Sequence, residues 1–152
     1  MDTSFNIRKA TQEDAEIIAR FNIEMALETE NKVLQQEKIE NGVRSLFKRP
    51  ELGFYMVAEV EGTVIGSLMI TKEWSDWRNG VFWWMQSVYV VPEFRRKGVY
   101  RSMYQKIKEL AAQKPDVCGF RLYVENENRI AQKVYSDLGM DETHYKMFEE
   151  MK

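Results

Sequence analysis

Three β-type runs follow one another in the middle of the chain and constrain its fold more than any other feature. They cover residues 55–60, 63–70 and 81–91 and are rich in β-branched and aromatic residues. Glu61-Gly62 joins the first two runs, and a two-residue link that ends in glycine predicts a tight hairpin. Residues 74–80 predict a second, looser turn. The centre of the fold is therefore expected to be an antiparallel meander.

Helical patterns flank this meander on both sides. Before it, Thr11 and Asp14 form a capping-box pattern, and Ile17, Phe21 and Met25 predict one apolar helical face. This mixture of strands and helices in one chain predicts a single α/β (α+β mixed) domain over residues 1–152. Its expected core is a central, mostly antiparallel sheet of about six to seven strands, flanked by about four helices. Outside the meander, the predicted elements are strands at 5–8, 117–124 and 140–148 and helices at 11–30, 35–47, 98–113 and 128–138.

Composition narrows the class of protein. Of the 152 residues, 44% are hydrophobic and 30% are charged, which is typical of one globular domain with its own core. The single cysteine, Cys118, excludes an internal disulfide and a thiolate metal cluster, and its apolar surroundings predict a buried side chain. The apolar runs are too short to span a membrane, and the first residues lack a secretory pattern. We therefore expect a cytoplasmic protein without a metal.

Charge is distributed unevenly along the chain. Residues 1–76 carry 9 Lys/Arg against 14 Asp/Glu, whereas residues 77–152 carry 13 against 10. The net charge of −2 gives no support for a nucleic-acid partner. An acidic half beside a basic half suits a protein that holds an anionic cofactor and a cationic substrate, and a solvated surface explains the same pattern equally well.

Residues 88–101 read Val-Tyr-Val-Val-Pro-Glu-Phe-Arg-Arg-Lys-Gly-Val-Tyr-Arg, which predicts a strand, a basic turn and the start of a helix. The first amides of a helix lack intrahelical partners, so a phosphate placed there meets several donors. Gly98 has no side chain to block its approach, and Arg95, Arg96 and Lys97 add positive charge. An ordinary turn with solvated basic residues remains an alternative, and neither a Walker loop nor a Gly-x-Gly-x-x-Gly pattern is present.

Two motifs stand in order in the second half of the chain. The first is Val90-x-Pro92-x-x-Arg95-x-x-Gly98-x-Tyr100, and the second lies in residues 122–140. They resemble the pyrophosphate loop and the later conserved block of the GNAT superfamily of acyl-CoA-dependent N-acetyltransferases, and the order of elements agrees with the GNAT fold. Tyr100 departs from that pattern because a small residue is usual there. In the second motif the matching residues are Val124, Asn128, Ala131, Tyr135 and Gly139, and Met140 replaces the usual phenylalanine.

The resemblance implies that acetyl-CoA is the co-substrate. The backbone of Val88 and Val90 would pair with the pantetheine arm, and the Val90 amide or a neighbour would stabilise charge on the thioester oxygen. Asn128 would contact pantetheine or order the start of its helix. Tyr135 would be the catalytic acid for the departing CoA thiolate, because a phenol's ordinary pKa of about 10 exceeds that of a thiol, about 8.5. The implied pyrophosphate-binding residues are Arg95, Arg96, Lys97, Gly98, Val99, Tyr100 and Arg101.

The resemblance further implies direct transfer of the acetyl group to a primary amine of a small molecule, in a ternary complex. Glu28, Trp84 and Gln86 are candidate acceptor residues, and the many carboxylates of the first two helices favour a cationic amine. The base is left open between a water chain, Glu28, Glu30 and Glu125. A possible aromatic wall for the acceptor comprises Trp74, Trp77, Trp83 and Trp84.

Three other functions fit the sequence. One is acetylation of a protein or peptide, which needs an open groove. Another is a non-catalytic acyl-CoA-binding sensor on the same fold, favoured by Tyr100 and the missing base. The third is a protein-interaction domain that uses the tryptophans. A homodimer is one expected assembly, since members of this family are often dimers.

Overall fold

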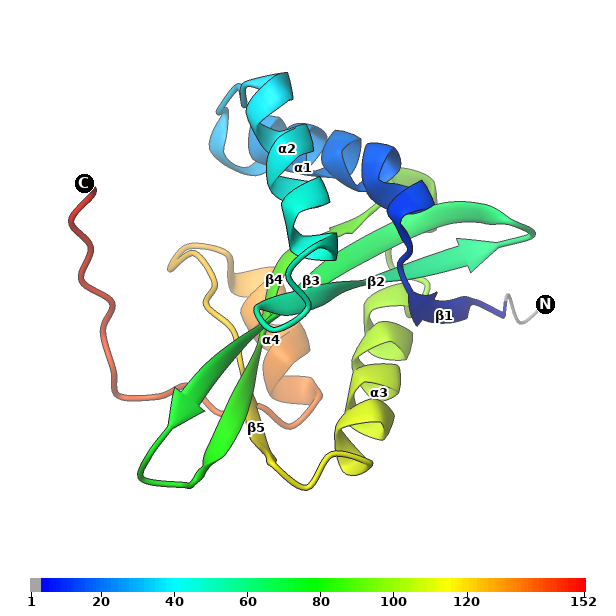
Figure 1. Ribbon diagram of the computed structural model, residues 1–152. Coiled ribbons are helices and arrows are strands. Elements are labelled where there is room, and N and C mark those ends of the chain that lie inside the picture. Colours follow the sequence, from blue (N-terminus) through cyan, green and yellow to red (C-terminus); the bar gives the residue numbers. More distant parts are fainter. Residues whose placement is uncertain (1–3) are drawn as a thin grey trace. The chain divides into compact units, whose positions relative to one another are not determined.

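The structure, a computed structural model, describes residues 4–152 (Figure 1). The described residues up to Leu122 form one compact unit, and those from Tyr123 onward form a second. The elements are β1 (Asn6–Lys9), α1 (Ala15–Glu30), α2 (Gln36–Phe47), β2 (Gly53–Val60), β3 (Thr63–Ser75), β4 (Gly80–Val90), α3 (Val99–Ala112), β5 (Val117–Arg121) and α4 (Arg129–Asp137), with 3₁₀ turns at Gln12–Asp14 and Pro92–Phe94.

The sheet of the first unit has the strand order β1-β2-β3-β4-β5. Neighbours from β1 to β4 are antiparallel and β5 is parallel to β4, so the predicted meander and the mixed α/β class are confirmed. Glu61 (φ 50°) and Gly62 (φ 80°) make the tight turn between β2 and β3, where two left-handed residues suit the twist of a hairpin. The second turn is shorter than predicted, because β3 continues through Trp74 to Ser75.

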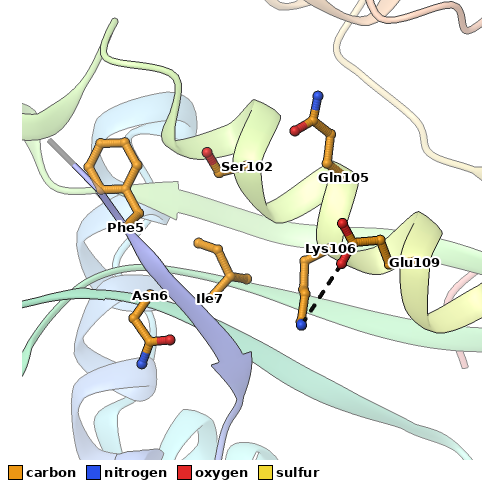
Figure 2. A pocket seen from close by; sticks show the side chains of 7 residues that line it. All are labelled: Phe5, Asn6, Ile7, Ser102, Gln105, Lys106 and Glu109. Carbon is orange, nitrogen blue, oxygen red and sulfur yellow. Dashed lines mark ion pairs between the residues drawn. The ribbon is translucent and has the colours of Figure 1, made fainter. Parts of the chain in front are cut away.

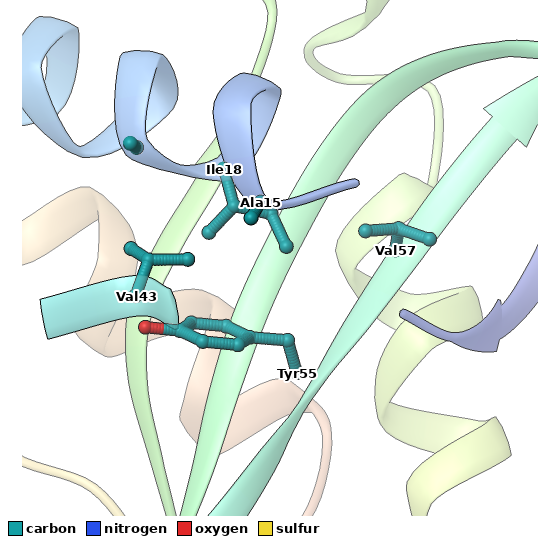
Figure 3. Packing of buried hydrophobic residues seen from close by; sticks show 6 residues of the cluster. Ala15, Ile18, Val43, Tyr55 and Val57 are labelled. Carbon is teal, nitrogen blue, oxygen red and sulfur yellow. The ribbon is translucent and has the colours of Figure 1, made fainter. Parts of the chain in front are cut away.

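Helices α1 and α2 lie over one face of this sheet (Figure 1). Figure 3 shows Ala15 and Ile18 of α1 and Val43 of α2 packed around Tyr55 and Val57 of β2. The side chains of Ile18, Val43 and Val57 are fully buried. Burial also raises the pKa of the Tyr55 hydroxyl to about 12. We call this surface of the sheet the α1 face.

Helix α3 packs against the opposite face. A chain of aromatic rings connects the elements there: Phe54 lies 5.3 Å from Trp83, Trp83 lies 6.5 Å from Phe120, and Phe120 lies 6.1 Å from Tyr104 of α3. Ile107, one turn further along α3, is fully buried. The sheet therefore has a core on each side, and the two cores fix the positions of α1 and α3 relative to β4.

One prediction about burial is only partly correct, and another is wrong. The buried stripe of α1 is displaced from the predicted one, and Ile17 and Met25 are only partly buried. Alanine gives a weak hydrophobic signal in a sequence, but its small side chain lets the helix approach the sheet closely. Cys118 is exposed, because β5 is an edge strand and fewer neighbours cover it. The buried residues of α1 are Ala15, Ile18, Ala19, Phe21, Asn22 and Ala26.

The second unit contains α4, which Asn128 caps by accepting a hydrogen bond from the Ala131 amide at 3.1 Å. Gly139 follows the end of α4 with a left-handed φ of 97°, a conformation that is common after the last residue of a helix. The predicted final strand at 140–148 is absent, so the described chain has five strands instead of six or seven. Its alternation is weak, residues 141–152 are exposed, and the unit holds no other strand to pair with its backbone groups.

Candidate functional site

Strand β4 separates from β5 halfway along its length. β5 pairs only with the stretch from Val81 to Trp84, so the rest of β4 up to Val90 has β3 on one side and no strand of the first unit on the other. We call this unpaired side the open edge of β4. Val88 and Val90, the residues expected to meet a pantetheine arm, both lie in this stretch.

A β-bulge changes the direction of side chains within the same stretch. Gln86 pairs with Met69 and Tyr89 pairs with Ser67, so three steps along β4 correspond to two along β3. Ser87 has a left-handed φ of 52° at this point. As a result, Gln86 and Tyr89 both point to the α1 face, although regular alternation would place residues three positions apart on opposite faces.

The loop after β4 presents backbone amides to solvent. Arg96 (φ 62°) and Gly98 (φ 82°) are left-handed, and α3 begins directly after Gly98 without a side-chain cap. The first hydrogen bond of the helix runs from Ser102 N to Gly98 O. The backbone amides of the turn before Ser102 therefore have no partner within the helix. A Cβ on Gly98 would meet no atom within 4 Å, so the space in front of the loop is open. This geometry fits an anionic phosphate group.

The basic residues of the loop differ in their surroundings. Arg96, Lys97 and Arg101 are exposed, and Lys97 Nζ lies 5.3 Å from the ring centroid of Phe94. Arg95 is exposed as well, but its side chain folds back and donates from Nε to Val90 O at 2.8 Å. The loop therefore carries exposed positive charge in front of α3, while one arginine is engaged with the end of β4.

The side chain of Tyr100 extends from α3 toward β4. Its hydroxyl donates to Met85 Sδ at 3.6 Å, and its ring stacks on Tyr104 at 6.2 Å. The bulky residue thus packs along the sheet side of α3, and Val99 beside it is buried. The departure from the usual small residue is accommodated by this packing.

Polar side chains form two hydrogen-bonded groups on the α1 face. Gln86 Nε2 donates to Thr71 Oγ1 at 2.6 Å, and Trp84 Nε1 donates to Glu73 Oε1 at 3.1 Å. Arg121 Nη1 of β5 donates to the same Glu73 oxygen at 2.7 Å. The sequence analysis did not identify Glu73 and Arg121 as site residues. Only the pairing of the strands shows that they lie next to the candidate residues Trp84 and Gln86.

Two carboxylates of α1 reach the end of β4. Glu28 Oε2 accepts from Arg95 Nη2 at 2.8 Å, and Glu24 Oε2 accepts from the Tyr89 hydroxyl at 2.8 Å. Burial and the Glu24 carboxylate raise the pKa of Tyr89 to about 12. Phe21 packs on the Tyr89 ring at 4.9 Å, which holds this part of α1 against the strand.

The four tryptophans do not form one wall. Trp83 is buried on the α3 side and belongs to the core. Trp84 faces α1, whereas Trp74 and Trp77 are 62% and 89% exposed at the far end of the β3–β4 hairpin. The predicted aromatic wall is therefore wrong. Trp83 and Trp84 point to opposite faces of β4, and the length of the hairpin carries Trp74 and Trp77 away from both.

The remaining predicted residues, Asn128 and Tyr135, lie in the second unit. The predicted role of Asn128 at the helix start is confirmed by its cap of α4. Tyr135 is partly buried near the end of α4, and this burial raises the pKa of its hydroxyl. Its phenol therefore stays protonated at neutral pH, as an acid requires.

A hollow of about 320 Å³ lies elsewhere, between β1 and α3 (Figure 2). It contains none of the predicted site residues. Within residues 4–152, no cluster of His, Cys, Asp and Glu is suited to a metal ion, and no helix is both long and apolar enough to cross a membrane. The hollow is lined by Phe5, Asn6, Ile7, Ser102, Gln105, Lys106 and Glu109.

Solved structures of other proteins share this fold. A possible acetyltransferase from Clostridium difficile 630 is 42% identical over 97% of both chains, with a TM-score of 0.91. The aminoglycoside acetyltransferase AAC(6′)-Iy, solved with a CoA bisubstrate analogue, is 17% identical over 98% of this chain and 99% of its own, with a TM-score of 0.77. A ribosomal-protein-alanine N-acetyltransferase from Brucella melitensis biovar Abortus 2308 is 13% identical over 98% and 100%, with a TM-score of 0.79. The last two likenesses concern the fold alone.

No protein of curated function matches the sequence significantly. The sequence profile of the acetyltransferase (GNAT) family, however, matches residues 15–140, which include the strand, the basic loop and both motifs. Together with the 42% identical structure, this match covers most of the chain. The protein therefore belongs to the GNAT family of acetyltransferases.

Proposed function

We propose that this protein transfers the acetyl group of acetyl-CoA to a primary amine of a small molecule. The observation that carries this proposal is the open edge of β4, which leads directly into a loop of uncapped amides at the start of α3. An extended strand edge suits the amide groups of pantetheine, and the loop suits a pyrophosphate. Acetyl-CoA would supply the activated acetyl thioester.

Different residues of the first unit would bind different parts of acetyl-CoA. The backbone of Val88 and Val90 would bind the pantetheine arm. The amides of the loop and of the first turn of α3 would bind the pyrophosphate, with Arg96, Lys97 and Arg101 contributing charge. Gly98 would allow the phosphates to approach the backbone, because the space at its missing side chain is open.

The acceptor would bind on the α1 face, beside the open edge of β4. This surface carries the carboxylates of Glu24 and Glu28 from α1 and of Glu73 from β3, together with Gln86. Arg95 and Arg121 neutralise Glu28 and Glu73, and Glu24 leaves one negative charge among these five groups, which favours a cationic ligand over an anionic one. A small amine with a second cationic group is therefore the class of acceptor that we propose.

The reaction would be a direct transfer within a ternary complex. The neutral amine nitrogen attacks the thioester carbon, a C–N bond forms, and the C–S bond breaks. One proton leaves the amine, to water or to a carboxylate, and one proton reaches the CoA sulfur. Tyr135 is the proposed donor of the second proton, because its hydroxyl stays protonated at neutral pH, where burial raises its pKa.

Calorimetric titration with acetyl-CoA tests the cofactor first, and a screen of amines for release of free CoA thiol tests the acceptor. We expect micromolar binding and turnover of small polycationic amines. Binding without turnover of any small amine, followed by acetylation of peptide amines, would assign the protein to peptide acetylation instead. Binding without any turnover would make it an acyl-CoA sensor, and no binding would refute the proposal.

A further inference from the structure

The Arg95 side chain occupies a different place from the other basic residues of the loop. Its guanidinium donates to Val90 O at 2.8 Å and to Glu28 Oε2 at 2.8 Å, and it lies 5.4 Å from the ring centroid of Tyr89. These contacts turn it back along β4, so it is bound to the end of the strand and to α1. A guanidinium is a rigid fork that can hold two acceptors at once, which an ammonium group cannot do as well.

The carbonyl that Arg95 holds faces the open edge of β4. Val91 N donates to Ile65 O at 2.9 Å, so the 65–91 pair is a hydrogen-bonded pair of the antiparallel ladder. The next pair, Gly66 and Val90, is therefore a non-hydrogen-bonded pair, and both polar groups of Val90 point away from β3. The N–H of Val90 thus projects from the same edge as the carbonyl that Arg95 binds.

Helix α1 fixes Arg95 from the other side. Glu28 holds the guanidinium, and Glu24, one turn earlier, holds the hydroxyl of Tyr89, on whose ring the guanidinium lies. Two carboxylates four residues apart on one helix therefore bind Tyr89, near the end of β4, and Arg95, in the loop that follows it. A movement of Arg95 would release both Val90 O and the contact with α1.

We propose that Arg95 is a positioning residue, held by Glu28, that orients the backbone of Val90 toward the acyl-pantetheine end of the cofactor instead of binding its phosphates. The inference rests on the proposed function, because it requires acyl-CoA along the open edge of β4. It assigns Arg95 to the thioester end of the site and leaves the phosphates to the amides and the other basic residues of the loop.

Two ligands separate these roles by calorimetry on the full chain. Acetyl-CoA has both the nucleotide with its pyrophosphate and the acyl-pantetheine arm, whereas adenosine 3′-phosphate 5′-diphosphate has the nucleotide and pyrophosphate without the arm. Arg95→Met should lower the affinity for acetyl-CoA about fivefold, which corresponds to the loss of one neutral hydrogen bond. The affinity for the nucleotide should stay unchanged. Arg95→Lys should show the same selective loss, because a lysine keeps the charge but not the fork.

Glu28→Ala should reproduce the selective loss to a smaller extent, and Glu16→Ala, at the other end of α1, serves as the matched control without effect. Equal weakening of both ligands by Arg95→Met, with recovery in Arg95→Lys, would make Arg95 a phosphate ligand and overturn the inference. Unchanged affinity for both ligands would overturn it as well. Failure of the unmodified protein to bind either ligand would refute the proposed function itself. Should Arg95→Met not fold, Arg95→Lys and Glu28→Ala carry the test.

Discussion

Gly98 shows how strongly the loop before α3 depends on a backbone conformation. Its φ is 82°, and a Cβ placed there would meet no atom within 4 Å. A steric clash therefore adds nothing to the cost of Gly98→Ala, which is backbone strain alone. That strain is about 1–2 kcal/mol for an L-residue, and the stiffer unfolded chain offsets roughly 0.4–1 kcal/mol of it. We expect Gly98→Ala to lower the free energy of unfolding by about 1 kcal/mol.

Gly42 provides the matched control, since it lies inside α2 and its Cβ would also meet no atom within 4 Å. Gly42→Ala should raise the free energy of unfolding by about 0.5–1 kcal/mol, because alanine is the better helix former. Urea titrations should shift the two midpoints in opposite directions, and the melting temperatures should differ by roughly 4–8 °C. If Gly98→Ala were as stable as the unmodified protein, the left-handed conformation would not be needed and the reasoning would be refuted.

Tyr135→Phe removes the proposed acidic proton and should lower amine turnover at least roughly tenfold while acetyl-CoA affinity stays the same; unchanged turnover would exclude the acid role. Gly98→Glu should weaken acetyl-CoA binding at least roughly tenfold by placing negative charge at the loop. Gly62→Glu, with the same left-handed conformation and open space in the β2–β3 turn, should not, and equal affinities in the two variants would show that the loop is not the cofactor site. Asp14, whose pKa is lowered mainly by its hydrogen bonds from Arg8, should stabilise the fold above its unfolded pKa of about 3.9 and lose that effect as the pH falls through its lower folded value. Asp14→Asn should therefore cost about 2 kcal/mol near neutral pH and much less near about pH 2 in chemical denaturation, and a pH-independent difference would contradict this.

Local patterns predicted the fold well. The two-residue link Glu61-Gly62 became a tight hairpin turn, and the capping box of Thr11 and Asp14 formed before α1. Both depend on residues within a few positions of each other, so the sequence carries their full signal. The strand at 140–148 failed for the opposite reason, since a strand exists only where another strand accepts its backbone.

The chemistry of the candidate site was only partly visible in the sequence. The basic residues of the loop indicated its charge and its position in the sequence. Arg95 and Glu28, however, are 67 residues apart, and no periodicity indicates their contact. Glu73 and Arg121 were missed for the same reason, because their shared hydrogen bond depends on the pairing of three strands. Tyr135 and Asn128 came from the family resemblance, and the cap of α4 by Asn128 is the part of it that local structure supports.

The bulge at Ser87 restricts how the length of β4 can change during evolution. Deleting one residue there would restore regular alternation and turn every later side chain of the strand to the opposite face. Tyr89 would leave Glu24 and point toward α3, while the polar groups of Val90 would turn from the open edge toward β3. Insertions and deletions should thus be tolerated at the far end of the β3–β4 hairpin, beyond Trp74, and eliminated by selection between Gln86 and Val90.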